Sequence, residues 1–257
     1  MYHLPLRCDG GTMSIDISIS KTSVEMGQKA ASLIASIIRD AIRDHGEARI
    51  VLSTGASQFE MFDALVKEDL NWSRVEMFHL DEYVNLPVTH PASFRKYLTE
   101  RFVNKVNPMA AHFVNGEGNI EENISILSAQ LKCAPIDVGV IGIGENGHIA
   151  FNDPPADFDA KEAYRIVNLD KRCREQQVGE GWFATIDDVP KQAISMLPRQ
   201  IMSCKCIVSV VPHAVKAQAV KNTITHPVDP MVPATLLKTH ENWHLFLDED
   251  SASMLLS

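Results

Sequence analysis

Short apolar runs alternate with segments of helical periodicity along most of the chain, and this alternation restricts the fold more than any other feature. Mostly apolar runs that read as buried strands occur at residues 49–52, 75–80, 136–143 and 204–211. Helical spacing of apolar residues occurs at 22–45, 59–66, 93–106, 120–131 and 215–223, and further strands are indicated at 15–20 and 243–247. The pattern predicts an α/β fold: a doubly wound, mostly parallel sheet with helices on both faces, a Rossmann-like three-layer arrangement.

The first predicted helix has clear signals at both ends. Thr22 and Glu25 have the spacing of a capping box, and His45-Gly46 ends the apolar repeat. With 257 residues, of which 45% are apolar, the chain can bury one large core. We interpret residues 1–14 as a disordered N-terminal extension and residues 15–257 as a single domain.

Charge and composition exclude several classes of partner. The net charge is −9 and no dense Lys/Arg block occurs, which argues against binding along a nucleic-acid backbone. No apolar stretch approaches the roughly 20 residues that cross a bilayer. Residues 1–12 carry no apolar core of signal-peptide length, so we expect no export. The five cysteines are odd in number and lack CxxC spacing, so we expect reduced thiols and a cytoplasmic protein. A small phosphorylated ligand is compatible with this charge, and a homo-oligomer is left open.

Ligands of open parallel sheets bind beyond the carboxyl ends of the strands, so the loops there are the first candidates for a site. One such loop joins a predicted strand to a helix and reads Ser53-Thr54-Gly55-Ala56-Ser57. Small and hydroxyl residues before a helix N-terminus can hold a phosphate through exposed amides. The alternative is that Ser57 only caps the helix, since Ser57 and Glu60 also have capping-box spacing. A P-loop is excluded because no Gly-Lys-Ser/Thr follows.

A second loop, residues 142–147, matches GxGxxG but does not predict a dinucleotide site. The dinucleotide motif opens a helix, whereas this sequence continues into Asn152-Asp153-Pro154-Pro155. The turn instead presents His148, whose imidazole titrates near neutrality and suits proton transfer. Asn146 and Asp153 are close enough along the chain to orient it. The alternative is a structural histidine.

Two further residues follow predicted strands. Asp81 comes directly after residues 75–80, where partial burial would raise the pKa of its carboxyl toward that of a useful base. Lys216 lies in the first turn after residues 204–211. The alternatives are a capping or solvated carboxylate and a surface lysine. We expect no zinc hydrolase site among the histidines.

Two blocks of sequence resemble the glucosamine-6-phosphate deaminase family, whose superfamily includes 6-phosphogluconolactonase. The likeness covers about residues 15–255, and its strongest pieces are Leu80-Asp81-Glu82-Tyr83-Val84, Leu86-Pro87, His90-Pro91 and residues 142–152. Lactonases characteristically follow the Gly-His pair with Thr/Ser-Ala-Ser-Leu-Phe-Pro. This chain has Ile149-Ala150-Phe151-Asn152-Asp153-Pro154, which is similar to the deaminase version.

The resemblance implies a hydrolase/isomerase of the deaminase type that converts an amino-sugar 6-phosphate to a ketose phosphate and ammonia, with no cofactor and no metal. It implies that Asp81 removes the proton from sugar C2 and that His148 handles ring opening, oriented by Asn146 and Asp153. It further implies that the substrate is bound by Thr54, Gly55, Ala56, Ser57, Gly144 and Lys216. Which amino-sugar epimer reacts stays open.

The chain departs from the family pattern at several positions. Asp153 stands where the family usually has Glu, and Asn146 where many members have Asp. Gln177 falls where a family arginine holds phosphate, with Arg172 and Arg174 nearby to compensate. The phosphate loop reads Thr-Gly-Ala-Ser-Gln rather than Thr-Gly-Gly-Thr-Pro. The known allosteric positions are not recognisable, so we expect no such regulation. The alternatives are a lactonase, an isomerase of another sugar phosphate, or a non-catalytic sugar-phosphate sensor.

Overall fold

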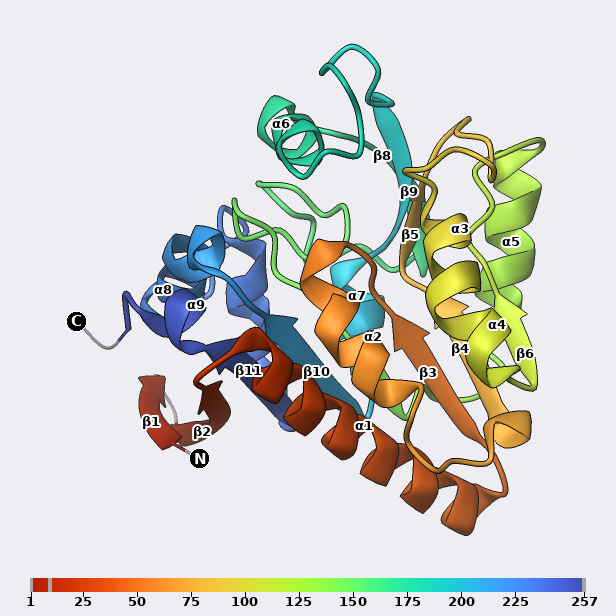
Figure 1. Ribbon diagram of the computed structural model, residues 1–257. Helices are drawn as coiled ribbons and strands as arrows, with labels where there is room; N and C mark the ends of the chain where they lie inside the picture. The colour runs from red at the N-terminus through yellow and green to blue at the C-terminus, as the bar shows by residue number, and fades with distance from the viewer. Residues whose placement is uncertain (1, 9–10, 256–257) are drawn as a thin grey trace.

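The central layer of the protein is a sheet whose strands, all but the edge strand β1, run parallel (Figure 1). The computed structural model describes residues 2–8 and 11–255. Across the sheet the order is β1-β2-β11-β10-β7-β3-β4-β6. In that order the strands span Tyr2–Cys8, Gly11–Ser20, Trp243–Asp248, Cys206–Val211, Val138–Val140, Ala48–Leu52, Val75–His79 and Ala110–His112. The predicted doubly wound, mostly parallel sheet is confirmed, although β7 is shorter than the predicted run at 136–143.

Helices cover both faces of this sheet. Successive residues of each strand point to opposite sides, and both sides carry apolar side chains that have to be buried. In β3, Ile50 and Leu52 pack into the apolar cluster beneath one helical layer, whereas Val51 packs into the cluster beneath the other. The first layer contains α1 (Ser23–His45), α2 (Phe59–Leu65), α3 (Phe94–Leu98) and α4 (Asn104–Val106). The second contains α5 (Ile120–Leu131), α7 (Pro198–Ile201), α8 (Ala217–Thr225) and α9 (Glu249–Ala252). These are the three layers that the sequence predicts.

Helix α1 begins and ends where its sequence indicates. The Thr22 side chain accepts a hydrogen bond from the Glu25 amide at 3.2 Å, which satisfies one of the unpaired donors of the first turn. Gly46 ends the helix at φ 82°, a left-handed conformation that glycine adopts without steric cost, and its amide donates to the Ile42 carbonyl.

A smaller antiparallel sheet continues beyond the carboxyl end of β4, and the sequence analysis did not predict it. Its strands are β5 (Asp81–Tyr83), β9 (Gln192–Met196) and β8 (Tyr164–Asn168), in that order. Helix α6 (Lys171–Gly179) lies beside it, above the central sheet in Figure 1. Residues 81–83 are therefore in a strand that pairs with β9, not in a solvated turn.

At the N-terminus, residues 2–8 and 11–14 belong to the paired strands β1 and β2, so the strand predicted at 15–20 begins at Gly11. Residues 1, 9 and 10 of the predicted extension, and residues 256 and 257, lie outside the described part of the chain. The disorder of this segment and the domain boundary at residue 15 stay predictions. No helix within the described residues is long and apolar enough to cross a membrane. The cysteines whose side chains are described, Cys133, Cys173, Cys204 and Cys206, are free thiols.

Gly27 lets α1 approach the start of α2, which follows the candidate phosphate loop. A Cβ at position 27 would lie 2.7 Å from the Glu60 carbonyl carbon and 2.8 Å from the Met61 amide nitrogen, so the two helices would have to separate. Overpacking of this kind costs about 1–3 kcal/mol, which exceeds the ~1 kcal/mol of helix propensity gained from alanine. We predict that Gly27→Ala lowers the free energy of unfolding by up to about 2 kcal/mol, measured by urea denaturation.

The matched control is Gln28→Ala, which changes the next residue of the same helix on its exposed face. That variant should keep the wild-type midpoint within about 0.5 kcal/mol of unfolding free energy. Wild-type stability of Gly27→Ala would show that the close approach of α1 and α2 does not limit the fold.

Candidate active site

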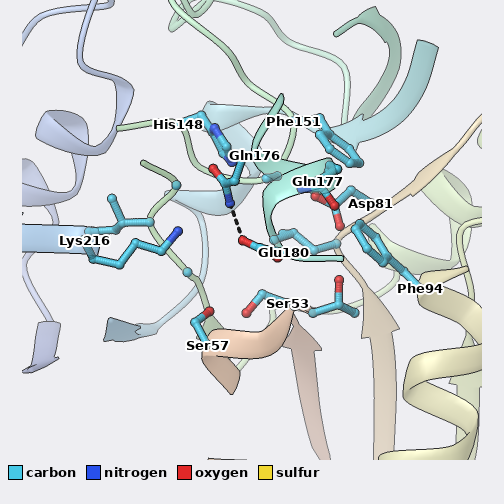
Figure 2. A pocket seen from close by; sticks show the side chains of 17 residues that line it. Ser53, Ser57, Asp81, Phe94, His148, Phe151, Gln176, Gln177, Glu180 and Lys216 are labelled. Carbon is cyan, nitrogen blue, oxygen red and sulfur yellow. Dashed lines mark hydrogen bonds between the residues drawn. The ribbon is translucent and has the colours of Figure 1, made fainter. Parts of the chain in front are cut away.

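Segments that follow neighbouring parallel strands surround one pocket beyond the carboxyl ends of the sheet (Figure 2). The loop after β3 forms its floor, Asp81 follows β4, the glycine-rich turn follows β7, and Lys216 follows β10. Residues 53, 54, 55, 57, 81, 144, 148 and 216 all line it. The predicted carboxylate of Asp81, the imidazole of His148 and the phosphate loop at 53–57 are far apart in the sequence. They meet at one rim of the sheet, where ligands of doubly wound folds bind.

The loop after β3 carries two hydroxyl groups, those of Ser53 and Ser57, that do not cap the following helix. Ser53 is buried and its Oγ has no hydrogen-bond partner among the described residues. Ser57 does not cap α2, whose N-cap is Gln58; instead the Ser57 hydroxyl accepts a hydrogen bond from the side-chain Nε2 of Gln58. Gly55 has φ 104°, which side-chain-bearing residues rarely adopt. Ala56 belongs to the loop but does not line the pocket. The capping interpretation of Ser57 is therefore wrong, and the loop is left open to a ligand.

Lys216 is a buried cation in the turn between β10 and α8. Lys216 is only 5% exposed, and burial lowers the pKa of its ammonium group. The negative charges of Glu180 and Glu145 act in the opposite direction and raise that pKa. No ion pair or hydrogen bond joins its Nζ to another residue in the described ranges. The surface-lysine alternative is wrong, and an unpaired ammonium beside the Ser53–Ser57 loop favours an anionic ligand.

Asp81 is a buried carboxylate at the start of β5. It is 6% exposed, and burial, followed by the charge of Glu82, raises the pKa of its carboxyl well above the usual value. Glu82 points elsewhere and accepts hydrogen bonds from the Ser93 hydroxyl and the Arg95 amide. Of the two adjacent acids, Glu82 supports the structure, whereas Asp81 faces the pocket. Its raised pKa makes the Asp81 carboxylate a stronger base than a solvated aspartate.

His148 lies flat against Gly144, and its neighbours fix its tautomer. The Asn146 Oδ1 accepts from the His148 amide at 3.0 Å and lies 2.5 Å from His148 Nδ1, while the Asn146 Nδ2 donates to Asp153 Oδ1 at 3.2 Å. Because an amide oxygen can only accept, Nδ1 carries the proton and Nε2 keeps its lone pair. Burial lowers the pKa of His148 to about 4, so the ring is neutral near pH 7.

Asp153 reaches His148 more weakly than Asn146 does. Its Oδ1 lies 3.4 Å from His148 Nδ1, and its Oδ2 accepts from the Asp170 amide at 3.1 Å. The shorter side chain thus keeps a place beside the imidazole and acts on it chiefly through Asn146.

Two glycines of the GxGxxG match have a local reason other than nucleotide binding. A Cβ at Gly144 would lie 2.1 Å from His148 Cε1, and Gly147 has φ 84°. No helix follows the turn. The rejection of a dinucleotide fingerprint agrees with this geometry.

Several pocket residues come from α6 and its end, where sequence reasoning found little. Gln176 accepts from the Glu145 amide and donates to Glu180 at 2.7 Å, the contact drawn in Figure 2. Gln177 is buried and accepts from the Tyr83 hydroxyl at 2.7 Å. The α6 segment is mostly polar, so apolar periodicity could not predict this helix. The one sequence signal for its start was Asp170, which caps the helix by accepting from the Cys173 amide.

The arginines expected to compensate for Gln177 do not line the pocket. Arg172 is exposed, and Arg174 donates to the Ile186 carbonyl. That expectation is wrong for the arrangement described. Phe94 and Phe151, which the sequence analysis did not single out as site residues, form an apolar wall beside Asp81 (Figure 2).

Residues 240–244 read His-Glu-x-x-His, the spacing that on a helix would predict a zinc site. In the structure they span a turn and the start of β11, and His244 contacts Asp16 at 3.0 Å. The two histidines therefore lack the shared helical face that the motif needs.

Comparisons with known proteins agree with this geometry. Residues 21–246 match the family described as glucosamine-6-phosphate isomerases/6-phosphogluconolactonase. A glucosamine-6-phosphate deaminase of Streptococcus uberis is 36% identical over 91% of this chain and 97% of its own length, and one of Oenococcus oeni is 32% identical over 93% and 98%.

Solved structures share the fold over nearly their whole length. A monomeric glucosamine-6-phosphate deaminase superposes with a TM-score of 0.85 at 27% identity, covering 93% of this chain and 100% of its own. A 6-phosphogluconolactonase of Trypanosoma brucei gives 0.78 at 17% identity, covering 95% and 100%, and shows a common fold alone. With the family match spanning most of the sequence and the pocket residues in place, the chain belongs to the glucosamine-6-phosphate isomerase/6-phosphogluconolactonase family.

Proposed function

We propose that this enzyme deaminates and isomerises glucosamine 6-phosphate, giving fructose 6-phosphate and ammonia without a cofactor. The observation that carries the proposal is the pocket itself: a buried carboxylate with a raised pKa, a neutral imidazole and an unpaired ammonium line the same cavity. Relatives of 32–36% identity bear the name of this activity over most of the chain. Proton transfer at adjacent sugar carbons needs such groups and no redox centre.

The phosphate is bound by Lys216 and by the loop of residues 53–57, with Ser53 and Ser57 contributing hydroxyls. Neutralising a buried ammonium with a phosphate dianion removes the cost of leaving that charge unpaired. The contact lies at the far end of the substrate from the reacting carbons, so its binding energy is available to hold C1 and C2 in register with the acid and base groups.

His148 opens the pyranose ring. Its Nε2 lone pair accepts the proton of the C1 hydroxyl, and the imidazolium so formed gives that proton to O5 as the C1–O5 bond breaks. The Nδ1–H contact with Asn146 holds the imidazole in this tautomer. A ring that is neutral near pH 7 can act in both directions of proton transfer.

Asp81 then removes the proton from C2, giving the enolamine, and returns a proton to C1. The resulting C2 iminium takes up water and loses ammonia. Water thus enters only at this last step, so the reaction is an isomerisation coupled to C–N cleavage, and "deaminase" describes it better than "hydrolase". The raised pKa brings the carboxyl nearer to the working pH, where a base is most efficient.

The direct test is to incubate the purified protein with glucosamine 6-phosphate and to measure ammonia and fructose 6-phosphate. We predict that Asp81→Asn, which keeps the shape of the side chain but not its basicity, lowers kcat by about 10²–10⁴-fold. Thermal unfolding of the variant serves as the folding control. Hydrolysis of 6-phosphogluconolactone without ammonia release would favour a lactonase instead, and sugar-phosphate binding with no turnover a sensor.

Gly144→Ala tests whether the glycine is required by the imidazole. The new methyl group would overlap the His148 ring, which must then move away from the substrate. A displacement near 1 Å can cost about 10²-fold, so we predict a loss of that size in kcat with little change in KM. Gly179→Ala is the matched control, because a Cβ there meets no atom within 4 Å. Equal activity of the two variants would contradict the assigned position of His148.

Lys216→Gln tests the phosphate assignment. Loss of a charged hydrogen bond worth about 1.5–3 kcal/mol should raise KM by about 10–100-fold and weaken inhibition by inorganic phosphate to a similar degree. Lys221→Gln, in the helix α8 that follows Lys216 and outside the pocket, should match the wild type. An unchanged phosphate inhibition constant in Lys216→Gln would remove Lys216 from the phosphate site.

A further inference from the structure

We propose that His148, Asp153 and Cys173 form a binding site for Zn²⁺ next to the pocket, and that the bound ion inhibits the enzyme. One ligand atom of each side chain lies within 4.8 Å of the other two. Within residues 2–8 and 11–255 this is the single group of His, Cys, Asp or Glu side chains that meets that spacing. The three residues come from the turn after β7 and from α6, so only the folded chain brings them together.

The three side chains are the ligand types that Zn²⁺ prefers. Zinc binds thiolate sulfur at about 2.3 Å and imidazole nitrogen and carboxylate oxygen at about 2.0–2.2 Å in a tetrahedron, which separates neighbouring ligand atoms by roughly 3.5 Å. His148 Nδ1 and Asp153 Oδ1 are already 3.4 Å apart. The other separations, at most 4.8 Å, would close by rotation of the side chains. The Asn146 Oδ1, which contacts His148, or a water can complete the four ligands.

Charge balance also favours a divalent ion here. In the metal-free protein the Cys173 thiol lies beside the Asp153 carboxylate. Zinc replaces two polar hydrogens: the thiol proton is released to solvent, and the imidazole proton moves from Nδ1 to Nε2. The ion's two positive charges then offset one thiolate and one carboxylate, which leaves the partly buried site neutral.

A bound ion would inhibit through His148. This residue lines the pocket, and Asp153 and Cys173 adjoin it from outside the pocket lining. Binding at Nδ1 places the remaining proton on Nε2 and removes the free lone pair that ring opening uses. This inhibitory consequence rests on the proposed function, whereas the binding itself does not.

Binding is tested with Co²⁺, whose bond to a thiolate gives a charge-transfer absorption band, followed by displacement with Zn²⁺. The wild type should bind one equivalent with this band and release it to Zn²⁺. Cys173→Ser, and Cys173→Ala as a second variant, should lose the band and bind Zn²⁺ at least about 100-fold more weakly, beyond the ~10–100-fold typical of outer-shell changes. Cys133→Ser, at an exposed thiol remote from the pocket, should match the wild type.

No thiolate band in the wild type, or unchanged zinc affinity in both Cys173 variants, would overturn the site. In deaminase assays, Zn²⁺ should inhibit the wild type and Cys133→Ser reversibly, with chelator restoring activity, while Cys173→Ser resists. A Cys173-dependent band without inhibition would overturn the inhibitory role. Absence of deaminase activity altogether would instead count against the proposed function, since the Co²⁺ measurement needs no turnover.

Discussion

Parallel strand pairing is the constraint on which this site depends. Leu52 at the end of β3 pairs with His79 of β4 on one side and with Val140 of β7 on the other, and β7 in turn pairs with β10. Since all these strands run in the same direction, the segments that leave them start at the same edge. The Asp81 carboxylate, the His148 imidazole and the Lys216 ammonium are far apart in the sequence. They line one pocket because their strands end at the same edge.

Burial at that edge produces the chemistry and also costs stability. Desolvation raises the pKa of Asp81 and lowers those of His148 and Lys216, so in each case the charged form is the one that the fold disfavours. Each pKa unit corresponds to about 1.4 kcal/mol. The two apolar clusters that flank the sheet supply the compensating free energy, and a bound phosphate would relieve the cost at Lys216.

The central sheet and most of its helices could be predicted because their apolar residues follow one period over long runs, as in α1. The loops that carry Ser53, Asp81, His148 and Lys216 could be located by the same reasoning, since each follows a predicted strand. The small sheet and α6 could not. Their residues are largely polar or belong to short strands, and they gain order from the packing of Tyr83, Phe151 and Cys173 rather than from a local pattern.

That unpredicted layer changes how the catalytic turn is supported. Asp153 accepts from Asn146 on one side and from the amide of Asp170, the N-cap of α6, on the other. The carboxylate that steadies the histidine is thus also a contact by which α6 docks. A longer Glu at this position could reach the imidazole directly, but it would need the space that Asp153 shares with the Cys173 thiol. The shorter acid at this position therefore leaves room for the Cys173 thiol between the catalytic turn and α6.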